Sequence, residues 1–172
     1  MVYWRKGDLA QAVHCARTAP QKNRTVAQVY YNVGVLALQE AETPEAFSFT
    51  EAVSYIESAV RLDPDSLAPM YMLVWLRATA PEQAIREGKE ALQFAEKVCR
   101  QTGYRDPSFL DTLGAAYAES WQFDVASEVA RIAAELARTH GRFKLENGIR
   151  ERVALYQTRT PYYNVTQEKF PR

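Results

Sequence analysis

The chain has little from which a catalytic or metal centre could be built. Its 172 residues include two cysteines, Cys15 and Cys99, which lie 84 positions apart, and two histidines, His14 and His140, which lie 126 positions apart. Neither spacing is that of a zinc site or a disulfide framework, and we interpret both thiols as small buried side chains. The seven glycines form no phosphate-binding loop. These scarcities argue against an enzyme and against a bound metal or cofactor.

An excess of charge of one sign and long apolar runs are also missing. Twenty-one basic residues balance twenty-one acidic ones, so no overall field attracts the chain to nucleic acid or to an anionic membrane. No stretch reaches the roughly 18 apolar residues of a membrane helix, and the first residues lack the apolar core of a signal peptide. We therefore expect a soluble protein that binds neither nucleic acid nor membrane, with the cytoplasm as the favoured compartment. The 47% of hydrophobic residues suffices for one ordinary core.

A small helical motif recurs four times along the chain. In each copy an alanine is followed by a small or apolar residue four positions later and by another three positions after that. The four copies are Ala12/Ala16/Ala19, Ala52/Ile56/Ala59, Ala91/Ala95/Val98 and Ala126/Ala130/Ala133. This spacing places each trio on one face of a helix, where small residues allow a second helix to approach closely. The leading alanines are 40, 39 and 35 residues apart, so the motif predicts an irregular repeat of paired helices.

Helix-breaking residues separate the copies. Pro64 closes the second copy, and Gly103 ends a long helix that we predict over 82–101. Asp106 and Pro107 are the expected N-cap and first residue of the next helix. Gly141 ends the last copy, and the apolar spacing beyond it predicts one more amphipathic helix over about 143–158.

The last copy has the most specific pattern. It reads Leu110-x-x-Leu113-Gly114-x-x-Tyr117, followed by Phe123, Ala126, Ala130 and Ala133. This pattern resembles the tetratricopeptide repeat, whose period is about 34 residues, and the likeness covers about residues 3–138. Residues 103–119 are also similar to the last repeat of C-terminal arrays in large bacterial multidomain proteins. One departure is Trp121, which stands in a turn where the family usually has a small residue, often glycine.

The resemblance implies an all-α fold. Specifically, it implies a right-handed solenoid of antiparallel helix pairs with a C-terminal capping helix, and a non-catalytic scaffold for protein–protein interaction. We predict one domain over residues 1–158 and a tail over 159–172. The domain comprises a partial repeat over 1–20, repeats over about 27–65, 67–103 and 107–140, and the capping helix over about 143–158. The partial repeat lacks most of its first helix, so we expect an incomplete N-terminal edge that a longer chain or another segment covers.

Two of the first helices of these repeats are apolar on more faces than helix pairing requires. In proteins that resemble this one, such helices line a concave groove that binds peptides. The candidate partner-binding residues are Tyr31, Val35, Leu38, Tyr71, Trp75, Ala78, Asp111 and Ala115. We expect them to bind an apolar or aromatic peptide or helix of a protein partner. The alternative is that the same side chains only pack helix on helix between repeats.

A second hypothesis gives the array a structural role. In it the chain is the C-terminal docking or oligomerisation module of a larger bacterial protein, and it self-associates or docks through the incomplete first repeat. Charge is segregated as well, with seven acidic and one basic residue over 40–65 and eight basic and three acidic residues over 137–172. These segments are either solvated helix faces or surfaces for electrostatic docking.

Overall fold

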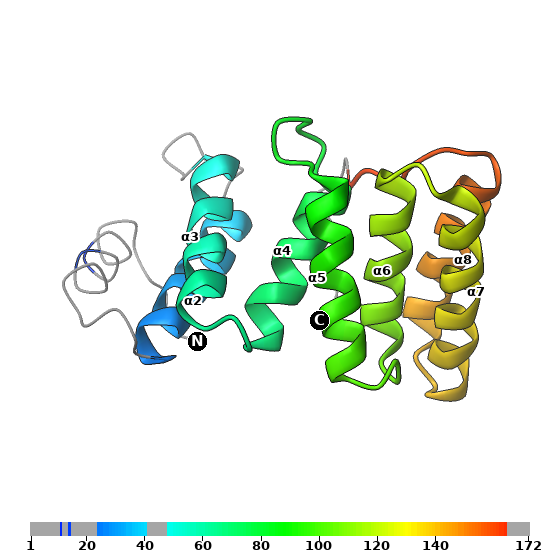
Figure 1. Ribbon diagram of the computed structural model, residues 1–172, viewed down its shortest axis with the longest axis horizontal. Helices are drawn as coiled ribbons and strands as arrows, with labels where there is room; N and C mark the ends of the chain where they lie inside the picture. Colours follow the sequence, from blue (N-terminus) through cyan, green and yellow to red (C-terminus); the bar gives the residue numbers. More distant parts are fainter. Residues whose placement is uncertain (1–10, 12–13, 15–23, 41–47, 165–172) are drawn as a thin grey trace. The chain divides into compact units, whose positions relative to one another are not determined.

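The computed structural model describes residues 24–40 and 48–164, together with Gln11 and His14. Within these ranges the chain forms helices and no strands (Figure 1), which confirms the all-α fold class. The chain divides into two compact units, Met1–Met70 and Tyr71–Arg172. Apart from Gln11 and His14, the partial repeat predicted over 1–20 lies outside the described residues.

The first unit is built on the helices α2 (Arg24–Glu40) and α3 (Phe49–Leu62), which pack against one another. The contact face of α3 is the small-residue face expected from the sequence. Its fully buried members are Ala52, Ile56 and Ala59. Gly34 on α2 makes the close approach possible, since a Cβ at this position would lie 2.6 Å from Cγ1 of Ile56.

The second unit contains most of α4 (Leu67–Thr79) and the helices α5 to α8. These are α5 (Gly88–Gln101), α6 (Pro107–Glu119), α7 (Phe123–Thr139) and α8 (Phe143–Gln157). Helices α5 to α8 pack in chain order, and α6 also contacts α8 (Figure 1). Because the connections are short, successive helices run antiparallel. Their buried contact layer is rich in alanine, as the small-residue motif predicts, and includes Ala91, Ala95, Ala116, Ala126, Ala130, Ala133 and Ala137.

The same left-handed turn ends each of the helices α5 to α8. In every turn the residue after the C-cap has a positive φ, and the amide that follows it donates to the carbonyl five residues earlier, which is the Schellman arrangement. After α5, Tyr104 also has a positive φ, of 57°. The positive φ values are 61° at Gly103, 62° at Trp121, 69° at Gly141 and 56° at Arg159. The hydrogen bonds are Tyr104 to Cys99, Gln122 to Tyr117, Arg142 to Ala137 and Thr160 to Leu155, at 2.8–2.9 Å. The same turn thus follows each of these helices, and glycine is the residue after the C-cap in two of the four turns.

The prediction of a helix over 82–101 is wrong for its first six residues. Helix α5 begins at Gly88, and the residues before it form a loop that contacts the end of α6. A Cβ on Gly88 would lie 2.9 Å from the backbone carbon of Glu119, so the start of α5 requires glycine for this close approach. In contrast, Asp106 and Pro107 begin α6 as N-cap and first residue, as predicted.

Candidate functional site

A buried ion pair joins α6 to α8 within the second unit. Arg152 donates from Nε to Oδ1 of Asp111 at 2.8 Å and from Nη2 to Oδ2 at 2.6 Å. Burial raises the pKa of the Asp111 carboxyl, and Arg152 offsets part of this shift. Burial lowers the pKa of Arg152, but the attraction of Asp111 and its hydrogen bonds together raise it above its ordinary value. The two-pronged geometry favours the form in which both groups are charged.

Aromatic side chains surround this ion pair. The guanidinium carbon of Arg152 lies 5.4 Å from the ring centroid of Trp75 on α4. The pKa values of Tyr71 and Tyr156 are raised, first by burial and then by the charge of Asp111. The indole N–H of Trp75 and the hydroxyl of Tyr156 are buried and have no hydrogen-bond partner among the described residues. Such buried donors are rare in folded proteins, and they leave hydrogen-bonding capacity at this site.

The chain beyond α8 returns past α6 towards α4 (Figure 1). We refer to Thr160–Asn164 as the strap. The ring of Tyr162 lies 6.0 Å from that of Trp75 and 5.2 Å from the guanidinium carbon of Arg152. The amide of Asn164 donates to the carbonyl of Thr79 at 2.8 Å. Thr79 is the last residue of α4, so its carbonyl has no partner within the helix and is available to an incoming backbone.

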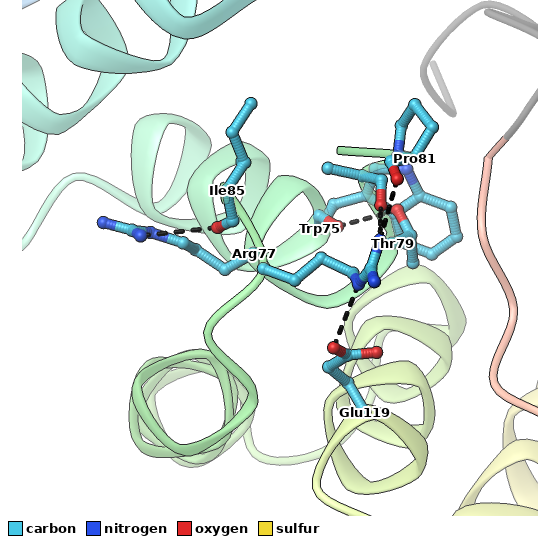
Figure 2. Close-up of polar contacts among 8 residues, drawn as sticks. Trp75, Arg77, Thr79, Pro81, Ile85 and Glu119 are labelled. Carbon is cyan, nitrogen blue, oxygen red and sulfur yellow. Dashed lines mark hydrogen bonds and ion pairs between the residues drawn. The ribbon is translucent and has the colours of Figure 1, made fainter. Parts of the chain in front are cut away.

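A second group of contacts, centred on Arg86, holds Tyr163 of the strap. Arg86 donates from Nε to Oε1 of Glu119 at 3.1 Å and from Nη1 to the carbonyls of Ala80 and Pro81 at 2.8 and 2.9 Å (Figure 2). Its guanidinium carbon lies 3.9 Å from the ring centroid of Tyr163. Burial raises the pKa of Glu119, while Arg86 and the neighbouring Tyr163 oppose the shift. Arg86 therefore links the α4–α5 loop, the end of α6 and the strap.

The structure brings together some of the candidate partner-binding residues that we predicted from the sequence. Tyr71, Trp75 and Asp111 gather around Arg152, as the interactions above show. Trp75 is 3% exposed and lies against the strap. The nominated residues that are also buried are Ala78, Asp111, Ala115 and, on α2, Leu38. Tyr31 and Val35 lie half-buried on α2, in the first unit.

The site also contains three parts that were not among the predicted partner-binding residues. These are Arg86, Arg152 and the strap. A usable signal existed for Arg152, because it stands three residues after Ile149 and four before Tyr156, on the buried face of α8. No local signal marks Arg86, whose partner Glu119 lies 33 residues away.

The site offers ring faces, two guanidinium groups and a helix-terminal carbonyl, which can pack against aromatic rings and form hydrogen bonds. Among the described residues, no three His, Cys, Asp or Glu side chains are placed to hold a metal ion. In the same part of the chain, every helix is too short or too polar to cross a membrane. No protein-family model, curated protein or solved structure matches the chain.

Proposed function

We propose that the chain is a non-catalytic scaffold of the tetratricopeptide type, which binds an extended peptide of a protein partner through aromatic side chains. The binding surface is the α4–α6–α8 face, defined here by Trp75, Thr79, Glu119 and Arg152. One observation carries the proposal: the strap lies on this face, with Tyr162 against Trp75 and Arg152 and the Asn164 amide bonded to Thr79. The face therefore already accommodates a short non-helical segment.

The packing of the second unit supports the scaffold assignment. In a right-handed array, α4, α6 and α8 would be the first helices of successive repeats, and α5 and α7 the second helices. Antiparallel neighbours, an alanine-rich contact layer and a recurring left-handed turn agree with this arrangement. The first helices of such an array share one side, and the strap contacts residues of α4 and α8, the first and the last of the three.

The residue types on this face suit a protein-binding role. Tryptophan, tyrosine and arginine contribute most of the binding energy at typical interfaces, because they combine a large apolar area with directed polar contacts. Here Trp75 and Arg152 offer two sides of an aromatic subsite, and the Thr79 carbonyl offers a fixed acceptor to the peptide backbone.

A peptide-display selection tests the proposal. The target is the 172-residue chain with Tyr162→Ser and Tyr163→Ser, which we term the serine variant. These two changes remove the aromatic rings of the strap. We expect selected peptides to carry aromatic residues and to bind at least about tenfold more weakly when Trp75→Leu is added, as for loss of an interface anchor. Trp121→Leu is the matched control, since Trp121 is 73% exposed in the α6–α7 turn.

Circular dichroism would show that each variant keeps its helices. The proposal fails if the serine variant selects no peptide, or if Trp75→Leu and Trp121→Leu weaken binding equally.

A further inference from the structure

The two tyrosines of the strap occupy chemically different subsites. Tyr162 lies beside both an indole and a guanidinium group, an environment that accepts any flat aromatic ring. Tyr163 lies under Arg86 and beside Glu119, whose Oε2 is buried without a hydrogen-bond partner among the described residues. This environment favours a ring with a hydroxyl group that can donate to the carboxylate. Consecutive side chains of an extended segment point to opposite sides, so one short peptide can fill both subsites at once.

The strap leaves some buried polar atoms at this face without hydrogen bonds. The indole N–H of Trp75 and Oδ1 of Asn164 are buried and have no hydrogen-bond partner among the described residues. Groups of this kind weaken a complex, because their hydrogen bonds to water are lost without replacement. A ligand that presents an acceptor to the Trp75 indole would therefore bind better than the strap does.

The strap can leave without opening the core. Residues 161–164 are only partly buried, whereas Asp111 and Arg152 beneath them are buried and bonded to one another. The strap begins three residues after the end of α8, and the Thr160 amide bonds back to Leu155 at 2.9 Å. So short a tether gives the strap an effective concentration of about millimolar at its own site.

From these three observations, and on the basis of the proposed function, we propose that the strap is a built-in competitor for the α4–α6–α8 face. The external ligand is then an extended peptide with two adjacent aromatic residues, the second of them tyrosine, which must displace the strap in order to bind.

Binding of a strap-derived peptide tests the proposal. A fluorescent peptide with the sequence of residues 158–166 is titrated into the wild-type chain and into the serine variant, and binding is measured by fluorescence anisotropy. Because the tethered strap no longer competes, we expect the serine variant to bind this peptide at least about tenfold more tightly than the wild type does. A peptide with both tyrosines replaced by serine should bind neither protein, and replacing only its second tyrosine by phenylalanine should weaken binding. Tyr104→Ser, which removes an exposed tyrosine elsewhere, should bind like the wild type.

Equal affinity of the serine variant and the wild type for the peptide would overturn the competitor role. If the display-selected peptides still bound through Trp75, the proposed function would stand while this inference failed. A chain that ends at Arg159 provides a second version of the test, and it should bind the peptide as the serine variant does.

The exposure of Trp75 gives an independent readout. With Trp4→Phe and Trp121→Phe, Trp75 is the only tryptophan left in the chain. We expect acrylamide to quench its fluorescence more strongly once Tyr162→Ser and Tyr163→Ser are added. Unchanged quenching would show that the strap does not cover this ring, which would overturn the proposal.

Discussion

Arg152 on α8 and Asp111 on α6 form a bidentate ion pair that joins these two helices. The residues are 41 positions apart, and the side chains are 10% and 2% exposed. The same guanidinium group lies against Trp75 and Tyr162, so one side chain supports both the core and the proposed binding face.

Removing one partner of this pair should be strongly destabilising. We expect Asp111→Asn to lower the free energy of unfolding by about 3–5 kcal/mol, because Arg152 would remain buried without a counter-charge. Replacing both residues, with Asp111→Asn and Arg152→Met, should cost less than the sum of the two single changes. Urea unfolding followed by circular dichroism measures all four free energies.

A matched control is the exposed pair of Glu135 and Arg138 on α7. Glu135→Gln should leave the unfolding curve unchanged, since solvent screens exposed pairs. Strict additivity at Asp111 and Arg152 would contradict the prediction, because it would mean that the two side chains do not interact.

Glu119 should make stability depend on pH in a defined direction. Burial raises its pKa above the ordinary 4.5, although Arg86 and Tyr163 oppose the shift. The folded state therefore binds a proton more tightly than the unfolded state does. The contribution of Glu119 to stability is fully present below pH 4.5 and is lost as the pH rises through the higher pKa of the folded state.

A comparison with Glu119→Gln isolates this effect. The difference in unfolding free energy, wild type minus variant, should decrease as the pH rises above 4.5 and then level off. Glu151→Gln, which removes one exposed carboxylate on α8, controls for the change in net charge. A difference that grows with pH would show that the ion pair with Arg86 outweighs the burial of Glu119.

The parts of the fold that the sequence predicted well depend on local signals. Asp106 and Pro107 start α6 because capping and a fixed φ act within one turn. The spacing of Ile149 and Tyr156, both buried, predicts the buried face of α8 because helix periodicity is local. The start of α5 was wrong because it depends on Gly88 and Arg86 contacting Glu119, a residue more than thirty positions later.

The candidate site was only partly predictable for the same reason. Trp75 and Asp111 stand out as an aromatic and a charged residue on otherwise apolar helix faces. The partners that give them a role, Arg152 and Tyr162, lie in the capping helix and in the tail, for which the sequence gives no docking position. Nothing in the periodicity of a helix predicts where a short non-helical segment will dock.

Cys99 should be inert towards thiol reagents while the chain is folded. Burial raises the pKa of its thiol to about 12 from the ordinary 9.0, with smaller contributions from Asp106 and Glu96. Because only the thiolate reacts, a shift of this size slows the reaction with an aromatic disulfide reagent at pH 8 by about 1,000-fold. The Cys15→Ser variant isolates Cys99 and should release one equivalent of reporter rapidly in urea and almost none in its absence. Rapid labelling of the folded variant would contradict the burial of this thiol.

Arg159→Gly should stabilise the fold, although it removes a charged side chain. Arg159 has a φ of 56° in the turn that ends α8, a backbone region that disfavours residues with a Cβ and that glycine adopts at little cost. Its ion pair with Asp124 spans 3.8 Å between side chains that are 73% and 96% exposed, so its loss matters little. Arg159→Ala is the matched control, because it removes the same charge and keeps the Cβ. Thermal and urea unfolding should place the glycine variant about 0.5–1 kcal/mol above the alanine variant, since relief of the left-handed strain outweighs the greater entropy of glycine in the unfolded chain. If the two variants were equally stable, the left-handed turn at the end of α8 would not persist in solution, and the strap would lose the feature that directs it back towards α4.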